Sequence, residues 1–225
     1  GNEIHNISNT NASFGGSVIG IYFAGGAGNT ISENFIHDLS VDLNSSASVY
    51  GIRIASGTSV YSNNIVSLGG NSNTNIYGIY QTGSVGNDNS IFFNTVYIGG
   101  SPSSVTYKSY ALYSTGTANA RDFRNNILVN ARSTAGGSNL HYALYIATAG
   151  GTLTCSNNDY SISGTGGIIG YYSGNKTTLP IVTGQDGGSL TVNPLLSLPG
   201  GSNASDYTPS NNTLLAMTGT GITAD

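Results

Sequence analysis

Residues 50–68 read YGIRIASGTSVYSNNIVSL, and this stretch contains three short runs of alternating apolar and polar residues. The runs cover 50–55, 59–63 and 65–68, with Gly, Ser and Asn between them. Such alternation, bounded by turn residues, predicts three short β-strands. The pattern also returns, since YGIR at 50–53 is matched by YGIY at 77–80, and SNN at 62–64 is matched at 156–158. The stretch is therefore one unit of a repeat.

Two columns of residues define the period. From Asn2 onward an asparagine recurs after 32, 30, 30, 32 and 32 residues, and the later members are Asn34, Asn64, Asn94, Asn126 and Asn158. A small residue precedes an apolar one in a second column, which contains Gly20, Gly51, Gly78, Ala111, Ala143 and Gly170. Two columns that keep step over six periods indicate a repeat architecture.

The period and the composition select the fold. The 225 residues include 33 glycines and only 7% charged residues, a composition that suits strands and turns and not paired helices. A propeller blade requires four antiparallel strands and roughly 40 residues. We therefore predict an all-β fold: a right-handed parallel β-helix, or solenoid, of about six coils over 1–173. Residues 174–225 lose the period and hold four of the five prolines, so we expect a C-terminal cap or a segment between modules.

The columns acquire structural roles in this fold. The apolar residues that follow the small column are expected to point inward; they are Ile21, Ile52, Ile79, Leu112, Leu144 and Tyr171. The asparagines Asn34, Asn64, Asn94, Asn126 and Asn158 are expected to occupy a corner of each coil, in the left-handed conformation, and to form a ladder of amide hydrogen bonds. Since Gly1 falls in the middle of a repeat, we expect either a longer parent chain or head-to-tail contacts with another copy.

The repeats resemble a known family. The stretches NTISENFIHDL (29–39), GIRIASGTSVYSNNIVSL (51–68) and YGIYQTGSVGNDNSIFFNTV (77–96) resemble the right-handed parallel β-helix repeats of the pectin-lyase-like superfamily. The tail, LPIVTGQDGGSLTVNPLL (179–196) followed by SDYTPSNNTLLAMTGTGITAD (205–225), is similar to the end of such helices in large secreted Bacteroidota surface proteins. The resemblance implies export and an extracellular or cell-surface location.

The family includes polysaccharide-cleaving enzymes, and such an activity would require catalytic residues in this sequence. Glycoside hydrolysis requires two suitably spaced carboxylates, but Glu33, Asp122 and Asp159 occupy different columns. We interpret Arg121, Asp122 and Arg124 as a solvated salt-bridge group, and residues 87–89 (Asn-Asp-Asn) as a polar turn. His5 and His37 are expected to stack on the exterior one coil apart, as surface histidines and not as metal ligands. We predict no catalytic residues, no metal and no cofactor.

The column most suggestive of binding lies two residues after the small column. It contains Tyr22, Arg53, Tyr80, Tyr113, Tyr145 and Tyr172. Placed on the outer face beside small residues, these rings could stack against sugars. The other interpretation is a self-stacking ladder that stabilises the strand face.

The sequence thus predicts a non-catalytic secreted structural or adhesive module. Such a module could be a subunit of an extracellular fibre or part of a tandem array, and its expected partners are other copies of the chain or adjacent modules. A polysaccharide-binding module that uses the tyrosine column is the alternative, and a polysaccharide lyase or hydrolase is the second alternative. The six basic residues form no dense patch, so a nucleic-acid partner is not expected. No apolar run approaches the roughly 18 residues of a membrane span.

Overall fold

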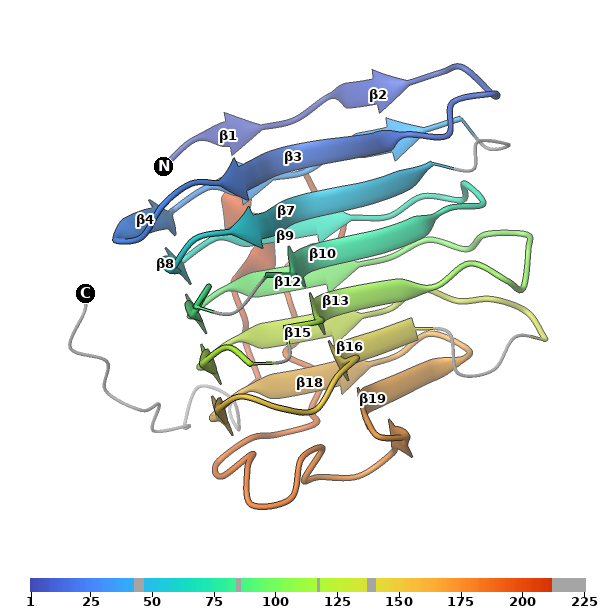
Figure 1. Ribbon diagram of the computed structural model, residues 1–225. Helices are drawn as coiled ribbons and strands as arrows, with labels where there is room; N and C mark the ends of the chain where they lie inside the picture. Colours follow the sequence, from blue (N-terminus) through green and yellow to red (C-terminus); the bar gives the residue numbers. More distant parts are fainter. Residues whose placement is uncertain (43–46, 84–85, 117, 137–140, 212–225) are drawn as a thin grey trace.

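The computed structural model describes residues 1–42, 47–83, 86–116, 118–136 and 141–211. The chain winds into a right-handed parallel β-helix of about five turns, along which the strands of successive coils lie side by side (Figure 1). One short 3-10 helix, Ala204–Tyr207, is the only helical element of the described residues. The predicted all-β solenoid is confirmed.

Three sheets form the walls of the helix. The first sheet contains β3 (Ser17–Ala24), β7 (Ser48–Ser56), β10 (Asn75–Gln81), β13 (Ser109–Ser114), β16 (His141–Ile146), β19 (Gly167–Tyr172) and the antiparallel β20 (Asn175–Lys176). The second contains β4 (Asn29–Ser32), β8 (Ser59–Ser62), β11 (Asn89–Phe92), β14 (Arg121–Arg124) and β17 (Leu153–Ser156). The third contains β1 (Glu3–Ile4), β5 (Phe35–Ile36), β9 (Ile65–Leu68), β12 (Thr95–Ile98), β15 (Ile127–Asn130) and β18 (Asp159–Ile162). A further pair, β2 (Ile7–Asn9) and β6 (Leu39–Val41), extends the first two coils.

The register of the sheets follows the sequence repeat. In the third sheet Val66 pairs with Val96, and Val96 pairs in turn with Leu128. In the first sheet Ile52 pairs with Ile79. Each coil therefore places equivalent residues directly over those of the coil before it.

The core is a continuous apolar column inside these walls. Each sheet contributes side chains that solvent does not reach, for example Ile79, Ile91 and Val96 within one coil. Burying a side chain of this size stabilises the fold by about 1.5–3 kcal/mol. Because each coil adds such a set, the free energy of burial is distributed evenly along the helix.

The small column also faces the core, and this bends the strands of the first sheet. A Cβ at Gly78 would lie 2.3 Å from Cγ1 of the core residue Val96, so glycine is needed for this close approach. Ala111, one coil on, is fully buried. Both Gly78 and Ile79 are thus interior, and the strict alternation on which the sequence prediction relied fails at this point.

The asparagine ladder is confirmed. Each amide Nδ2 donates to the Oδ1 of the next asparagine at 2.8–3.1 Å, through Asn2, Asn34, Asn64, Asn94, Asn126 and Asn158. Each Oδ1 from Asn34 to Asn158 also accepts the backbone N–H of the preceding asparagine at 2.9–3.2 Å. The second proton of Nδ2 is donated to a backbone carbonyl in the coil before, as from Asn64 to Ile31 at 2.9 Å. Each inner rung is therefore saturated with hydrogen bonds.

The left-handed residue of the corner is not the ladder asparagine. The residue before it has a positive φ of 53–59° in every coil from the second onward: Glu33, Asn63, Phe93, Asn125 and Asn157. The sequence prediction was wrong by one position. The ladder asparagine is held by its amide, which leaves the preceding residue to make the turn, even where that residue is a phenylalanine.

The described part of the tail packs against the last coil. The hydroxyl of the buried Tyr160 donates to Oδ1 of Asp186 at 2.7 Å, and Oδ2 of Asp186 accepts the N–H of Ile181 at 2.7 Å. The chain then returns along the outer face of the third sheet, as the orange-to-red segment of Figure 1 shows. There Leu196 and Tyr207 pack with Phe35 and Val129. We call residues 193–211 the strap; residues 212–225 lie outside the described residues.

Candidate functional site

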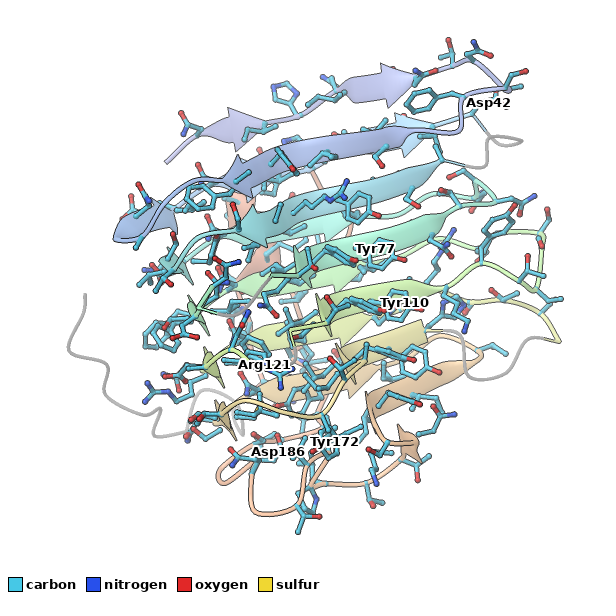
Figure 2. All side chains as sticks on the ribbon, viewed as in Figure 1. Asp42, Tyr77, Tyr110, Arg121, Tyr172 and Asp186 are labelled. Atoms are coloured by element: carbon cyan, nitrogen blue, oxygen red, sulfur yellow. The ribbon has the colours of Figure 1, made fainter. Side chains whose placement is uncertain are left out.

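Two adjacent rows of aromatic rings cover the outer face of the first sheet. The first tyrosine row is formed by the in-register residues Tyr50, Tyr77, Tyr110 and Tyr142. The second tyrosine row is formed by Tyr80, Tyr113, Tyr145 and Tyr171, and Arg53 and Tyr22 continue it toward the first coil. Figure 2 labels Tyr77 and Tyr110, which lie one above the other on this face.

One member of the predicted column is wrong, and so is the expectation that Tyr171 points inward. Tyr171, and not Tyr172, pairs with Tyr145, and the two rings stack with centroids 4.3 Å apart. Tyr172 pairs with Ile146 and packs against the core. The cause is a shift in the last coil, where Gly170 lies level with Leu144 and not with Ala143.

Sequence reasoning missed the first tyrosine row altogether. Under strict alternation Tyr77 would point to the same side as Ile79, which is inward. Since Gly78 and Ile79 are both interior, Tyr77 and Tyr80 both project outward, and their ring centroids are 5.1 Å apart. The repeated Tyr-Gly and Tyr-Ala pairs were the available signal, because a tyrosine before an interior glycine marks the bend.

The rings form a herringbone. Within each row they stack nearly parallel, at 6–14° and 4.3–5.6 Å between centroids. Between the rows they meet at 73–88°. Rings about 5 Å apart along the helix reach a plane spacing of about 3.6 Å only if they tilt by roughly 45°. Two rows tilted in opposite senses then meet nearly at right angles, as observed.

The herringbone covers ring faces and leaves ring edges and hydroxyls at the surface. Tyr110 and Tyr142 of the first row are buried, whereas Tyr80, Tyr113 and Tyr145 of the second row are half-buried. Burial, followed by the electrostatic effect of the neighbouring phenols, raises the pKa of Tyr142 to about 12. The same causes raise the pKa of Tyr77 and of Tyr110 well above the ordinary value. These phenols are therefore neutral over the physiological range of pH.

Arg53 closes the rows at the end near the first coils. Its guanidinium carbon lies 5.2 Å from the ring centroid of Tyr50 and 5.6 Å from that of Tyr22. Cation–π contacts of this kind contribute about 0.5–1 kcal/mol at exposed sites. Tyr22 itself is 57% exposed, so the last ring of the series is the one open to solvent.

The two histidines stack as predicted, but one of them is not a surface residue. The rings of His5 and His37 are 5.0 Å apart and parallel within 1°. His37 is only 3% exposed, and its nitrogens contact the carboxylates of Glu3 at 3.0 Å and Asp38 at 2.8 Å. In the described ranges no three His, Cys, Asp or Glu side chains are grouped so as to hold a metal ion.

The predicted salt-bridge group divides into two parts. Arg124 binds Asp122 through both carboxylate oxygens and lies over the ring of Phe92, with 5.0 Å from the guanidinium carbon to the centroid. Arg121 instead points inward and is buried, where it donates to Oγ of Ser114 and to the carbonyls of Thr148 and Gly150. Burial lowers the pKa of Arg121. The interpretation of Arg121 as solvated was wrong, because its position on the strand is an inward one.

The turn at 87–89 is a backbone-binding turn. Oδ1 of Asn87 accepts the N–H of Gly57 at 2.9 Å, and Oδ1 of Asp88 accepts the N–H of Ala120 at 2.6 Å. These oxygens therefore join neighbouring coils, which agrees with the interpretation as a polar turn.

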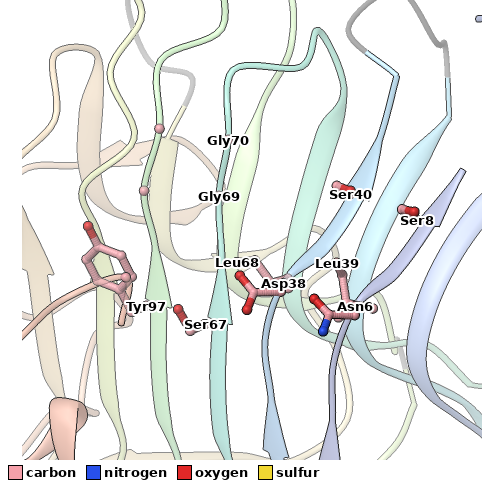
Figure 3. A pocket seen from close by; sticks show the side chains of 13 residues that line it. Asn6, Ser8, Asp38, Leu39, Ser40, Ser67, Leu68, Gly69, Gly70 and Tyr97 are labelled. Atoms are coloured by element: carbon pink, nitrogen blue, oxygen red, sulfur yellow. The ribbon is translucent and has the colours of Figure 1, made fainter. Parts of the chain in front are cut away.

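A groove of about 560 Å³ lies between the strap and the outer face of the third sheet. Asn6, Asp38, Ser67 and Tyr97 come from four successive coils and line it in that order, as Figure 3 shows. Glycines of two coils, including Gly69 and Gly99, provide an uncovered backbone, and Gly200 of the strap lies at its margin. One aromatic ring beside several hydrogen-bonding groups suits a polyhydroxylated ligand.

Comparison of the chain with protein-family models, with curated proteins and with solved structures finds no match. A search of the described residues for membrane spans finds no helix long and apolar enough to cross a bilayer.

A buried polar cluster at the loop end of the first sheet was also missed by the sequence reasoning. His141 is fully buried, with Nδ1 at 2.9 Å from Oγ of Ser109 and Nε2 at 2.8 Å from Oγ1 of Thr134. Burial, and then the charge of Arg132, lowers the pKa of His141 to about 4. Arg132 is itself buried and donates to the carbonyls of Thr74 and Ser72. These contacts hold loops of successive coils together, and the side chains that make them are buried.

Proposed function

We propose that the protein is a non-catalytic structural or adhesive β-helix module. The observation that supports this most directly is that the side chains able to bind a ligand contact each other instead. The amides of the asparagine ladder bind each other, and the tyrosines of both rows cover each other's faces. Side chains committed to one another from coil to coil stiffen a rod and leave few groups free for chemistry.

The proposal includes secretion and a cell-surface location. Its support is the resemblance of the repeats and tail to the pectin-lyase-like superfamily and to secreted Bacteroidota surface proteins. A charge-poor chain with 33 glycines and a single cysteine suits a module stabilised by packing and hydrogen bonds without disulfides.

The partners we propose are other copies of the chain or adjacent modules. Ile21 and Ile31 of the first coil are partly exposed, whereas Ile52 and Tyr61, their equivalents one coil on, are fully buried. A further coil placed over the first would bury the same surface. Ile7 of β2 in the same coil is an exposed apolar residue, which gives a site for a blocking substitution.

Sedimentation velocity over a range of concentrations, with negative-stain microscopy, tests this assembly. End-to-end particles are expected for the native chain, and Ile7→Lys should reduce them without loss of the far-ultraviolet circular dichroism of the fold. Monomers at every concentration, with and without the substitution, would contradict the proposed self-association.

Polysaccharide binding is the second candidate, and the groove beside Tyr97 favours it. The tyrosine rows suit it less, since sugars stack on ring faces and these faces are covered. Glycan titration of Tyr97→Ala, with Tyr113→Phe as the control, separates the two surfaces. Loss of binding in Tyr97→Ala alone would assign the glycan to the groove, and absence of binding by the native protein would remove this candidate. Screening for released unsaturated or reducing sugars tests the third candidate, a polysaccharide lyase or hydrolase.

A further inference from the structure

The second tyrosine row places four phenols in contact along the helix at its surface. Tyr80 and Tyr113 are 5.1 Å apart between centroids and parallel within 8°, and Tyr145 and Tyr171 are 4.3 Å apart and parallel within 6°. All four are half-buried, so that their outer edges reach solvent. We propose that this row is a site of oxidative modification, at which tyrosines of adjacent coils couple to dityrosine and join the coils covalently.

The chemistry requires two phenoxyl radicals in contact. A peroxidase with hydrogen peroxide removes one electron and one proton from each of two phenols, and the peroxide is reduced to two molecules of water. The unpaired electron of a phenoxyl radical is shared between the oxygen and the ring carbons ortho to it. Two such carbons form a carbon–carbon bond, and the hydrogen on each then moves to oxygen, which restores both phenols. The product has lost two hydrogens in total.

The stacking brings the reacting carbons together. Nearly parallel rings at a plane spacing of about 3.6 Å are already at van der Waals contact, and the parallel register gives both rings the same direction from the backbone. The ortho carbons lie beside the hydroxyls at the outer edges of the rings. A radical on Tyr113 therefore meets Tyr80 or Tyr145 before it meets a tyrosine of another molecule.

The pairing follows from the spacing of the four rings. Tyr145 and Tyr171 have the shortest separation in the row, so their coupling is favoured. Coupling of this pair leaves Tyr80 and Tyr113 as the second pair, and two disjoint bonds then use all four phenols. The first row is less suited, since Tyr110 and Tyr142 are buried.

Other tyrosines provide internal contrasts. Tyr61 and Tyr160 are fully buried in the core. Tyr22 is exposed, but Arg53 lies between it and Tyr80, so Tyr22 is expected to couple only between molecules. The selectivity therefore depends on the fold and is absent from the unfolded chain.

The test is oxidation of the full chain by a peroxidase and hydrogen peroxide at low protein concentration, followed by isolation of monomers and peptide mapping. Trypsin places Tyr80 in peptide 54–108 and Tyr113 in peptide 109–121, so their bond joins two peptides. Tyr145 and Tyr171 both lie in 133–176, and a second cut before Asp159 separates them unless they are bonded. We expect both bonds, and a higher urea midpoint for the oxidised monomer.

Phenylalanine variants retain the stacked rings and give the controls. Tyr113→Phe should lose the bond between 54–108 and 109–121 and keep the bond within 133–176. Tyr107→Phe should change neither. The same oxidation in urea should scatter the products over many tyrosines. Absence of dityrosine in the folded monomer, coupling only between molecules, or an equal pattern in the folded and the unfolded chain would each overturn the proposal.

Discussion

Replacing Asn64 by leucine tests the asparagine ladder, because leucine has a similar size and adds apolar surface. Asn64 is fully buried. Its Oδ1 accepts the backbone N–H of Asn34 at 3.1 Å and Nδ2 of Asn34 at 2.8 Å. Its own Nδ2 donates to Oδ1 of Asn94 and to the carbonyl of Ile31, both at 2.9 Å. The substitution removes all four hydrogen bonds.

The expected loss of stability follows from the groups left behind. Two donors of Asn34, its backbone N–H and one amide proton, lose their acceptor in a buried site, at about 1–3 kcal/mol each. Burial of leucine in place of the amide offsets about 1.5–3 kcal/mol. The free energy of unfolding should therefore fall by roughly 2 kcal/mol, although the variant is more hydrophobic than the native protein.

Urea unfolding followed by circular dichroism and tyrosine fluorescence measures this difference, since the chain has 15 tyrosines and no tryptophan. The matched control is Asn2→Leu. Asn2 is exposed and forms the end of the ladder, so its change should stay within about 0.5 kcal/mol. If Asn64→Leu were as stable as the native protein, or if both substitutions cost the same, the reasoning would be refuted.

Four further predictions concern the tyrosines, two buried ionisable groups and the strap. Tyr113→Ala should lower the free energy of unfolding by about 2–3 kcal/mol, because it removes ring contacts within and between the rows. Tyr113→Phe should be nearly neutral. If the two variants lost the same free energy of unfolding, the ring contacts would contribute nothing. The pKa of His141 is lowered from 6.5 to about 4, so its contribution to stability is present above pH 6.5 and is lost as the pH falls toward 4; His141→Gln should flatten this part of the pH profile of unfolding. Asp159 has the opposite pH dependence, because its pKa is raised from 3.8 to about 6 and its contribution to stability is lost as the pH rises through 6. Relative to the native protein, Asp159→Asn should therefore gain stability between pH 4 and pH 7. A difference in unfolding free energy that does not change with pH would contradict the burial of this carboxyl. Tyr207→Ala should release the strap, since Tyr207 packs on Phe35, and its hydroxyl donates to the carbonyl of Gly201 and accepts from the hydroxyl of Ser67. Limited proteolysis should then cut within 193–211, and unchanged protection would contradict the packing.

Much of the fold was predictable because, in a solenoid, the spacing of the sequence repeat determines which residues of successive coils are paired. The spacing of Asn64 and Asn94 predicted both the parallel strands and the amide ladder. The same logic predicted that Ile52 and Ile79 would be inward. In a repeat protein the same structural requirement applies to every coil. A residue preference that is weak within one coil therefore becomes a strong prediction when it recurs in all of them.

The errors arise where a strand departs from simple alternation. The interior Gly78 turns the chain so that Tyr77 joins Tyr80 on the outside, which a period of two does not predict. In the last coil the shift of Gly170 replaces Tyr172 by Tyr171 in the second row. Arg121 was assigned to solvent from its charge, although its strand position is inward and carbonyls satisfy its guanidinium. Side-chain direction at a bend depends on the packing of neighbouring coils, which one repeat does not encode.

The central claim is that residues about 30 apart lie directly over one another, and engineered disulfides test it most directly. Val60 and Ser90 are register partners in the second sheet, and Asp122 follows Ser90 in the next coil. Adjacent parallel strands are about 4.8 Å apart, within the range for a disulfide, whereas residues two coils apart exceed 7 Å. In a Cys155→Ala background, Val60→Cys with Ser90→Cys should form an intramolecular disulfide under mild oxidation, and Val60→Cys with Asp122→Cys should retain two free thiols. Free thiols in the first pair, or a disulfide in the second, would contradict the stacking of the coils.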